Sequence, residues 1–311
     1  MDILLSAPRG FCAGVVRAVD IVERALAQYG PPIYVRHEIV HNPHVVNDLR
    51  QKGAVFVNDV DDVPPGQTIV FSAHGVSPAV RNAASARGLR VIDATCPLVT
   101  KVHLEAIQAA RRGYTIILIG HRGHDEVIGT MGEIPEHTVL IETAAEAMTI
   151  RVPDPDKVMV LTQTTLSVDD TAEIIRVLRS RFPNLAASAK DDICYATSNR
   201  QRALKAITGE VDLVLVIGAE NSSNCNRLRE LAADAGLPAY LISSPEDINP
   251  SWLKGVLRVG VTSGASTPER LVQAVVEALG THSVRTVAVA EENVTFALPK
   301  GLRSKTPVGQ R

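Results

Sequence analysis

Three cysteines lie far apart in this chain of 311 residues, and each precedes a segment with helical periodicity. Cys12, Cys96 and Cys194 are separated by 84 and 98 residues. A thiol at a helix N-terminus is stabilised as the thiolate by the helix dipole, so its pKa is expected to be lowered. Three such thiolates brought together could hold a zinc ion or three irons of an iron–sulfur cluster. In the second case one iron would remain open to a substrate oxygen, which is a catalytic arrangement.

The cysteine spacing leaves several interpretations open. A lone cysteine such as the one in RGFCAG is most often a small buried hydrophobic residue. Structural zinc sites usually pair their cysteines as CxxC, and no such pair occurs. Iron–sulfur clusters usually have four cysteine ligands. The fourth cysteine, Cys225, lies in the serine- and asparagine-rich stretch NSSNCNRL, and we interpret it as a structural residue.

Polar side chains follow directly after several apolar runs that are typical of buried strands. In parallel α/β sheets the ligand site lies beyond the carboxyl ends of the strands, so we expect these side chains to meet. Hydroxyl and amide groups beside helix N-termini are suited to a phosphate group. Each residue alone is more often only a helix cap or a structural residue, and it is their recurrence that indicates a site. The candidates are His41, Asn42, His74, His121, Arg122, His124, Asp125, Glu126, Thr164, Thr165, Asn221, Ser222, Ser223, Asn224 and Ser266.

The elements that must position these residues are strands and helices in alternation, which is typical of an α/β protein with largely parallel strands. Several helix starts are marked by a capping residue followed by proline, as at Asn42, Ser77 and Cys96. Strands are predicted at residues 3–7, 68–73, 90–94, 114–120, 158–163, 212–218 and 257–263.

The rhythm of the cysteines suggests three similar α/β units of just under 100 residues, each directing one thiolate at a shared centre. We therefore predict a first α/β domain at residues 1–96, a second at 97–193 and a third at 194–281. The remaining C-terminal segment, residues 282–311, has a polar tail from about Pro299 without periodicity, and we expect it to be partly disordered.

The composition argues against several classes of function. The formal net charge of -2 gives no basic excess for nucleic acid. Apolar runs such as YTIILIG are much shorter than the ~20 residues of a membrane helix, and no secretion signal is recognised. With four cysteines in so long a chain, a reducing cytoplasm is the expected location. No GxGxxG follows the first strand, and neither GxxxxGKS nor GxxxxGKT occurs, so nicotinamide and P-loop nucleotides lose their usual support.

Nine motifs, in order from residue 1 to about residue 300, resemble the LytB/IspH family of 4-hydroxy-3-methylbut-2-enyl diphosphate reductases. Each motif alone is short, but nine in register leave little room for coincidence. They are RGFCAGV, RHEIVHN, FSAHGVS, DATCPLVTKVH, GHRGHDEVIGTMGE, LTQTTLSVDD, DDICYATSNRQ, NSSNCNRL and VGVTSGAS. The resemblance implies three α/β domains in pseudo-threefold arrangement around a central iron–sulfur cluster.

The resemblance also implies roles for individual residues. Cys12, Cys96 and Cys194 match the ligands of three irons of a 4Fe-4S cluster, which leaves one iron open to substrate. The implied catalytic residues are Glu126, which relays protons, His124, and Thr164, which lies near the substrate hydroxyl. The implied substrate-binding positions are His41, His74, His124, Thr164, Ser222, Ser223, Asn224 and Ser266.

The reaction implied by the resemblance is a two-electron reductive dehydration. The allylic hydroxyl of the substrate binds the open iron, the cluster supplies electrons one at a time, and the C–O bond breaks with loss of water. Protonation of the resulting allyl species gives isopentenyl or dimethylallyl diphosphate, in the last step of the non-mevalonate isoprenoid pathway. The implied electron donor is reduced flavodoxin or ferredoxin.

Two other functions stay open on the residues alone. A zinc-dependent hydrolase of a phosphorylated metabolite could use His121, His124 and Glu126, although HRGHDE lacks the HExxH spacing that places two histidines on one helix face. A non-catalytic iron–sulfur sensor could bind a protein partner or RNA, although no basic patch is evident. Metal analysis separates the first from the reductase, and turnover with substrate separates the second.

Overall fold

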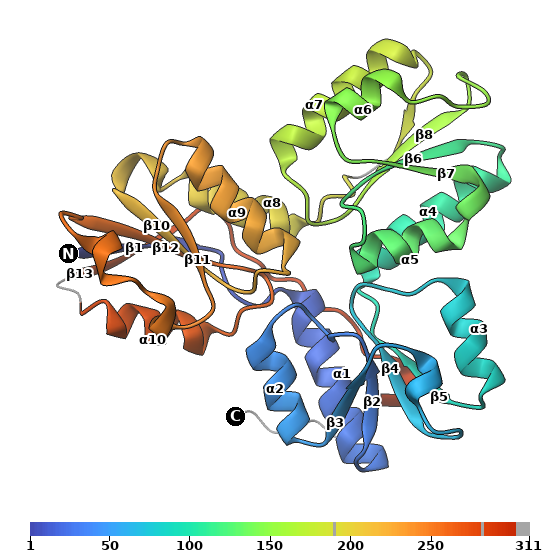
Figure 1. Ribbon diagram of the computed structural model, residues 1–311, viewed down its shortest axis with the longest axis horizontal. Coiled ribbons are helices and arrows are strands. Elements are labelled where there is room, and N and C mark those ends of the chain that lie inside the picture. Colours follow the sequence, from blue (N-terminus) through green and yellow to red (C-terminus); the bar gives the residue numbers. More distant parts are fainter. Residues whose placement is uncertain (189–190, 281–282, 303–311) are drawn as a thin grey trace.

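The computed structural model describes residues 1–188, 191–280 and 283–302, and it shows three lobes around a common centre (Figure 1). Each lobe holds one sheet whose strands all pair in parallel, with helices packed against it. Parallel sheets need cover on both faces, and the helices supply it. The prediction of three α/β domains is therefore confirmed. None of the described helices is both long and apolar enough to span a membrane.

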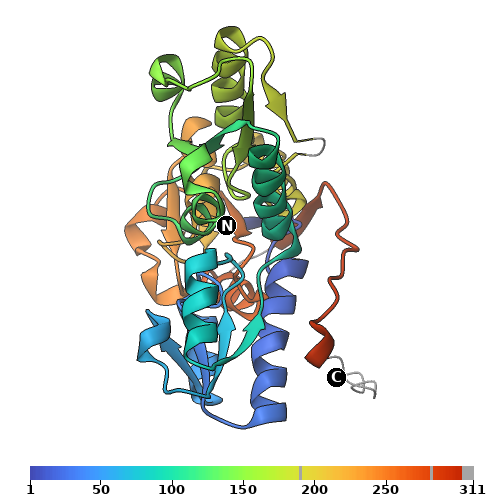
Figure 2. The ribbon, with the colours of Figure 1, turned by 90° about the vertical axis from the view of Figure 1, so that its right-hand side faces the viewer.

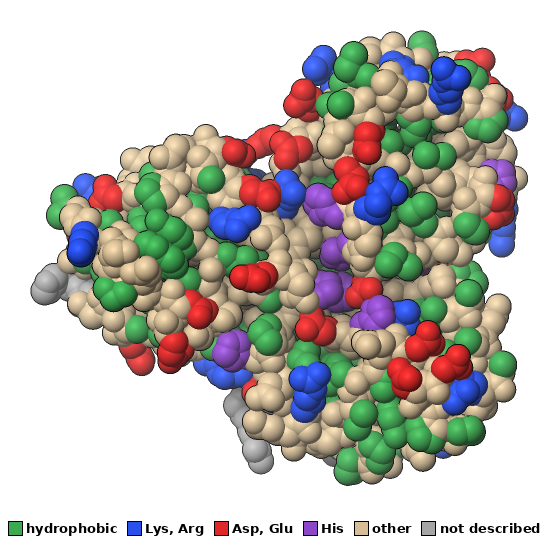
Figure 3. All heavy atoms as spheres, viewed as in Figure 1, with side chains coloured by type: hydrophobic (Ala, Val, Ile, Leu, Met, Phe, Trp, Pro, Cys, Tyr) green, Lys and Arg blue, Asp and Glu red, His purple; other side chains and the backbone are tan. Residues whose placement is uncertain are grey.

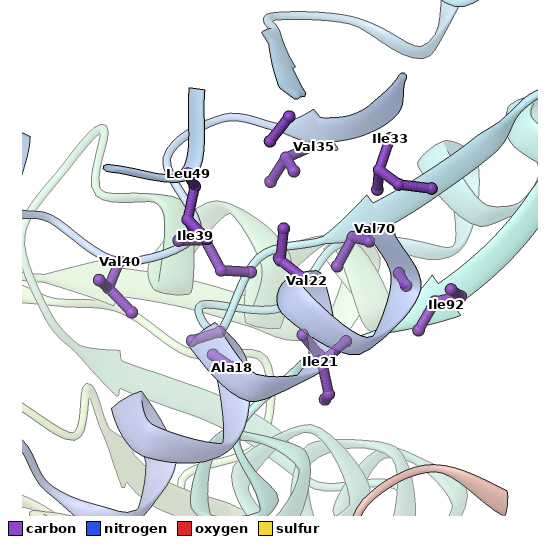
Figure 4. Close-up of a cluster of buried hydrophobic side chains, with 14 of the residues drawn as sticks. Ala18, Ile21, Val22, Ile33, Val35, Ile39, Val40, Leu49, Val70 and Ile92 are labelled. Atoms are coloured by element: carbon purple, nitrogen blue, oxygen red, sulfur yellow. The ribbon is translucent and has the colours of Figure 1, made fainter. Parts of the chain in front are cut away.

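The first domain has a four-stranded sheet of order β3-β2-β4-β5. One apolar face of its first helix packs on this sheet, where Ile21 and Val22 meet Val35 and Val70 (Figure 4). A helix covering a sheet must bury such a stripe, because apolar residues at helical spacing share one face. The elements are α1 (Ala13–Tyr29), β2 (Ile33–Arg36), α2 (Pro43–Gln51), β3 (Ala54–Val57), β4 (Thr68–Phe71), α3 (Pro78–Ala86) and β5 (Arg90–Asp93).

The second domain has a four-stranded sheet of order β7-β6-β8-β9. Its two central strands are buried along their whole length, as expected for strands covered on both faces. The elements are α4 (Pro97–Arg111), β6 (Thr115–Ile119), α5 (Asp125–Glu133), β7 (Thr138–Ile141), α6 (Ala144–Thr149), β8 (Val158–Thr162), α7 (Val168–Arg181) and β9 (Ala186–Ala187).

The third domain has a five-stranded sheet of order β11-β10-β12-β1-β13. Both faces of the sheet are apolar, so two separate cores lie on either side of it. The elements are β1 (Asp2–Ala7), α8 (Tyr195–Lys205), β10 (Leu213–Ile217), α9 (Ser223–Asp234), β11 (Ala239–Ile242), β12 (Arg258–Ser263), α10 (Glu269–Ala278) and β13 (Ser283–Ala288).

The predicted boundaries of the first and third domains are wrong for the N-terminal strand. The first domain was expected to begin at residue 1, but β1 lies between β12 and β13 in the third sheet. Ile3 and Leu5 are buried there with Val261. An apolar run predicts that a strand will be buried, but it does not say which sheet receives it. Here the partner strands lie at the other end of the chain, so no local pattern could reveal the pairing.

The expectation for the C-terminal segment also needs correction. Its first part forms strand β13, at the edge of the third sheet beside β1. Residues 289–302 then cross to the first domain, where Leu298 and Leu302 pack against its core. Disorder from Pro299 onward is therefore wrong as far as residue 302, because the two leucines anchor this stretch. The rest of the predicted tail, residues 303–311, lies outside the described residues.

Candidate active site

Each of the three cysteines predicted as cluster ligands is the N-cap of a helix: Cys12 of α1, Cys96 of α4 and Cys194 of α8. Their backbone N–H groups donate to carbonyl oxygens in loops that each follow a strand of another domain. The acceptors are Ala265 after β12 (3.1 Å), Ala73 after β4 (2.9 Å) and Thr164 after β8 (3.0 Å), in that order. The same backbone contact is repeated three times, and it places each thiol at the junction of two domains.

The three thiols line one cavity, with a volume of about 110 Å³. Gly14 lies beside two of them, since a Cβ built on it would be 2.8 Å from the Sγ of Cys96 and 3.7 Å from the Sγ of Cys12. The first distance is shorter than van der Waals contact, so any side chain at position 14 would displace a thiol. Glycine here keeps the space around the sulfur atoms open.

The separation of the sulfur atoms discriminates between metals. Metal-binding atoms of His, Cys, Asp and Glu lie in one group of three, all within 4.8 Å of one another, at a single place among the described residues: His41, His74 and Asp125. The sulfur atoms of the three cysteines form no such group, so at least two of them are more than 4.8 Å apart. A single tetrahedral zinc ion with Zn–S bonds of about 2.3 Å would hold its sulfur ligands about 3.8 Å apart. The thiol positions therefore suit a cluster of several metal ions better than one zinc ion.

The protonation of these thiols differs from the expectation. Burial raises the pKa of Cys96 to about 12 and the pKa of Cys194 to about 11. The prediction of lowered pKa values at these two thiols is wrong for the metal-free protein, because loss of solvation outweighs the hydrogen bonds from the backbone of each helix start. Metal binding would have to displace the thiol protons.

Three histidines from two domains gather in the same cavity. The ring centroids of His41 and His74 are 4.0 Å apart, and that of His124 lies 5.4 and 5.8 Å from them. Histidine side chains are visible in the hollow where the three lobes meet (Figure 3). Burial lowers the pKa of His124 to about 4 and holds the pKa of His74 well below its ordinary value. Both rings are therefore neutral at pH 7.

Each histidine has a different partner on its Nδ1 atom. The Nδ1 of His41 lies 3.2 Å from a carboxylate oxygen of Glu38. That of His74 lies 3.4 Å from the hydroxyl of Ser72 and 4.0 Å from a carboxylate oxygen of Asp125. The Nδ1 of His124 accepts the backbone N–H of Glu126 at 3.1 Å. The neutral ring of His124 must therefore carry its proton on Nε2, where it is available to a ligand. Glu38 was not predicted, although RHEIVH places it beside His41, and Asp125 was among the polar residues after the strand at 114–120 but was assigned no role.

A buried carboxyl group lies next to Thr164. Glu126, on α5, is 3% exposed, and its two oxygens accept the backbone N–H of Thr164 at 2.6 Å and the hydroxyl of Thr164 at 3.0 Å. Burial raises the pKa of Glu126 to about 7, against the opposing effect of these two hydrogen bonds. A carboxyl group that is half protonated near neutral pH is able to act as a general acid.

The third domain adds hydroxyl and amide groups from the start of α9 and from the loop after β12. The hydroxyl of Ser223 donates to Thr165 O at 3.2 Å, and that of Ser266 donates to His41 O at 2.9 Å. Asn224 is 3% exposed, and both polar atoms of its side-chain amide are buried without a hydrogen-bond partner. The Nε2 of His41 is in the same condition. Such buried groups are uncommon unless a ligand or water pairs with them.

All twelve residues to which the family resemblance assigns a role line this single cavity. They come from three domains and from segments that span most of the chain. They are Cys12, His41, His74, Cys96, His124, Glu126, Thr164, Cys194, Ser222, Ser223, Asn224 and Ser266.

Comparison with known families agrees with this arrangement. The family of the LytB protein matches residues 3–280 of the chain. The chain belongs to the LytB family. Its matched region begins in β1 and ends after α10, so it covers nearly all of the three domains that build the cavity.

Close relatives of this LytB family member carry one name. Proteins named 4-hydroxy-3-methylbut-2-enyl diphosphate reductase from Azoarcus sp. (strain BH72) and from Ralstonia nicotianae are 58% and 56% identical to it, each over 305 residues. The alignments cover 97% of this chain and 98% and 94% of those relatives.

Solved structures resemble it as well. The E-1-hydroxy-2-methyl-but-2-enyl-4-diphosphate reductase from Plasmodium falciparum superposes with a TM-score of 0.94 at 42% identity, covering 97% of this chain and 96% of that one. A structure described as (E)-4-hydroxy-3-methyl-but-2-enyl diphosphate reductase, the terminal enzyme of the non-mevalonate pathway, gives a TM-score of 0.62 at 33% identity. That comparison covers 90% of this chain and 99% of the other.

The fourth cysteine of this LytB family member lies outside the cavity. Cys225 is 0% exposed, and its Sγ lies 2.2 Å from the position that a Cβ would take on either Gly218 or Gly264. The thiol therefore fills a space between the ends of β10 and β12 that exists because both neighbours are glycine. This packing supports our interpretation of Cys225 as a structural residue.

Some residues of the cavity were not predicted from the sequence, and the alternative zinc site that the sequence left open is not formed. Tyr195 and Phe296 line the cavity, but neither was predicted, although Tyr195 lies within the motif DDICYATSNRQ. Phe296 in particular lies in a segment that the sequence predicted to be partly disordered. His121 lines a neighbouring pocket with Glu142 instead, so the zinc site of His121, His124 and Glu126 is not formed.

Proposed function

We propose that this chain is a 4-hydroxy-3-methylbut-2-enyl diphosphate reductase. It removes the allylic hydroxyl in a two-electron reductive dehydration that yields isopentenyl and dimethylallyl diphosphate, the last step of the non-mevalonate isoprenoid pathway. The observation that carries this proposal is one cavity lined by three cysteines, three histidines and a buried Glu126–Thr164 pair. Thiolates suit a redox metal cluster, whereas imidazole, hydroxyl and amide groups suit an anionic substrate.

Cys12, Cys96 and Cys194 would hold a 4Fe-4S cluster. The wide spread of their sulfur atoms and the bare backbone of Gly14 both fit a group larger than one ion. Three cysteines leave one of four irons without a protein thiolate. When bound, the cluster supplies the electrons and a Lewis-acidic iron for the hydroxyl of the substrate.

The diphosphate would lie among the histidines and the N-terminus of α9. The Nε2 of His41 and the amide of Asn224 are buried without partners, and an anion would provide them. The hydrogen bond at Nδ1 of His124 keeps an N–H on the opposite side of that ring. The hydroxyls of Ser222, Ser223 and Ser266 line the same space, and His74 completes the set.

Glu126 would donate the proton that the departing hydroxyl needs. Its pKa of about 7 leaves a large share of the carboxyl protonated at neutral pH. The backbone N–H and hydroxyl of Thr164 fix both of its oxygens, so the carboxyl group cannot turn freely. Thr164 also lines the cavity and would carry the proton onward to the substrate oxygen. His124 precedes Glu126 by two residues and orders the start of α5 through the bond to its N–H.

The electrons would come from reduced flavodoxin or ferredoxin. The closely similar relatives are reductases by name, and a reductase needs a source of electrons. The GxGxxG motif that would favour a bound nicotinamide does not follow the first strand. Low-potential carriers of this kind, together with four cysteines that form no disulfide, fit a cytoplasmic location.

The test is metal analysis and turnover on protein purified without oxygen. We expect about four irons and four sulfides per chain, which is the content of one 4Fe-4S cluster. We expect Mössbauer spectra in which one iron changes when the diphosphate substrate is added, and product formation with a reduced donor. Zinc in place of iron, or a cluster that is indifferent to substrate, would contradict the proposal.

A further inference from the structure

Residues 289–302, here called the strap, connect the third domain to the first. In Figure 2 the strap runs beside α1, along the side that is turned away from the viewer in Figure 1. Its start is fixed by Val289, whose N–H donates to Ala7 O at 3.0 Å, and its end by the buried Leu302. Between these points most of its residues are exposed, so the strap is held to the rest of the protein by a small number of contacts.

One of these contacts is an ion pair with a fully buried arginine. Arg200, on α8, is 0% exposed, and its Nη1 lies 3.1 Å from an oxygen of Glu292 in the strap. Its Nη2 donates to Gly10 O at 2.6 Å. Gly10 is two residues before Cys12, and α8 begins directly after Cys194. One guanidinium group therefore joins the strap to the backbone beside two of the three cysteines.

A second arginine makes the matching connection to the remaining cysteine. Arg17, on α1, donates from Nε to Ala297 O of the strap at 2.9 Å. Its Nη1 donates to Ala94 O at 3.1 Å and to Thr95 O at 3.0 Å, directly before Cys96. Arg17 therefore joins the strap to the helix that Cys12 caps and to the loop that carries Cys96.

The strap also supplies part of the cavity wall. Phe296, between the two points held by the arginines, lines the cavity together with the three thiols. The neighbouring groove on the outer side is lined by Phe296, Val16 and Val294, of which Val16 is 53% and Val294 40% exposed. Phe296 is thus the part of the strap that separates the thiols from an open groove.

We propose that Arg17, Arg200 and the strap are positioning residues for the iron–sulfur cluster. They hold the three cysteine-bearing segments at fixed separations and close the cavity on the side of the outer groove, which slows the escape of iron. The inference rests on the proposed cluster. A buried arginine is costly to fold unless its charge is paired, and both Nη atoms of Arg200 are paired. They meet the carbonyl oxygens of Gly10 and Ala196, each two residues from a cysteine, and the carboxylate of Glu292 in the strap. Clusters and metal sites need ligands fixed to a fraction of an ångström, which such contacts provide.

The experiment compares matched pairs of variants after anaerobic cluster loading. Glu292→Gln removes the charge that pairs with Arg200, and Glu291→Gln changes the adjacent exposed carboxylate, for which the structure shows no ion pair or hydrogen bond. Phe296→Ala opens the cavity wall, and Val294→Ala shortens a neighbour that lines only the outer groove. The rate of iron release to a ferrous chelator is measured at a temperature at which circular dichroism shows every variant to be folded. Electron paramagnetic resonance spectra of the reduced cluster are recorded in parallel.

We expect Glu292→Gln and Phe296→Ala to release iron about tenfold faster than their partners, as for loss of an outer-shell contact at a metal site. We also expect a changed resonance spectrum for Glu292→Gln and an unchanged one for Phe296→Ala. Release rates within about twofold of the controls would overturn the proposal. It would also be overturned if only variants with a lowered melting temperature released iron faster, because the effect would then be general destabilisation. Failure of the unaltered protein to take up four irons would instead contradict the proposed function.

Discussion

The cysteines and the histidines of the cavity are held in different ways. Each cysteine caps a helix and donates its backbone N–H to a loop of another domain, and this contact is repeated three times. The three histidines have three different partners on Nδ1: the carboxylate of Glu38, the hydroxyl of Ser72 and the backbone N–H of Glu126. The repetition of the fold therefore accounts for the position of the thiols, whereas the histidine side of the cavity, proposed to bind the anion and here called the anion-binding part, depends on individual side chains.

This difference determines how each part should respond to substitution. The backbone places each cysteine, but in the proposed function only its sulfur would bind the cluster, so the loss of one thiol should remove a ligand that nothing else replaces. In the proposed function several groups of the other part share one diphosphate, so the loss of one of them should weaken substrate binding without abolishing it. We therefore expect all-or-none effects at the thiols and graded effects around the histidines.

The largest effect is expected for the cysteines. Serine in place of Cys12, Cys96 or Cys194 should abolish the intact cluster and with it turnover. Cys225→Ser should keep both, because the Cys225 thiol fills a space between two glycines and does not line the cavity. Iron and sulfide content after anaerobic reconstitution checks this, and a Cys225→Ser protein without iron would show that the ligand assignment is wrong.

The next largest effect is expected at the buried carboxyl group. Glu126→Gln should leave iron content unchanged and lower turnover by about 10²- to 10⁴-fold, because an amide keeps the shape but supplies no proton. Glu136→Gln, at an exposed position of the same domain, should be near normal. Steady-state turnover with a chemical reductant measures both variants. Near-normal turnover by Glu126→Gln would remove the proton-donor role from this residue.

The pH dependence of turnover should reveal the same group. Burial disfavours the charged carboxylate, so the pKa of Glu126 is raised to about 7 and the proton is present below that pH. Turnover should fall as pH rises above about 7, by about tenfold for each further pH unit, because the protonated fraction falls in that proportion. The slope should be missing in Glu126→Gln. A profile that is flat up to pH 9 in the unaltered protein would contradict the assignment.

The repeated part of the site could be predicted from the sequence, and much of its setting could not. Cys12, Cys96 and Cys194 each precede a helical pattern, so local sequence was enough to place them as caps. The raised pKa of Cys96 could not be foreseen, because it depends on burial by segments distant in sequence. The same holds for β1, whose partners are β12 and β13. Phe296 was missed because a single aromatic residue in an aperiodic stretch predicts nothing about its contacts.

A smaller effect is expected at the amide of the anion-binding part. Asn224→Ala should raise KM by about tenfold with little change in iron content, since a hydrogen bond to a charged group is worth about 1.5–3 kcal/mol. Asn226→Ala is the matched control, because the Asn226 side chain donates to Glu220 O and Ser222 O and does not line the cavity. Equal KM values for both variants would mean that the unpaired amide of Asn224 does not meet the substrate.

The smallest expected effect is a fractional uptake of protons on ligand binding, with inorganic pyrophosphate as the probe. Burial holds the pKa of His124 at about 4 and the pKa of His74 lower than its ordinary value, so both rings are neutral at pH 7. A bound polyanion favours the imidazolium form and raises both pKa values. The effect should be smaller at His124, because its second proton would fall on the Nδ1 that accepts the N–H of Glu126. The complex then binds more protons than the separate molecules, so affinity should fall as pH rises.

Calorimetry in two buffers of different ionisation enthalpy measures this uptake at pH 7. Glu126 would add to the signal with the same sign, because a nearby anion also raises the pKa of a carboxyl group. Repeating the titration with Glu126→Gln separates the two sources. Uptake that persists in this variant assigns the proton to the histidines. Uptake that disappears would mean that the rings bind as neutral donors, as the N–H on Nε2 of His124 permits. In that case the histidines would bind the anion through hydrogen bonds from neutral rings. They would then differ from the thiols only in how they are positioned, by individual side chains and not by a repeated backbone contact.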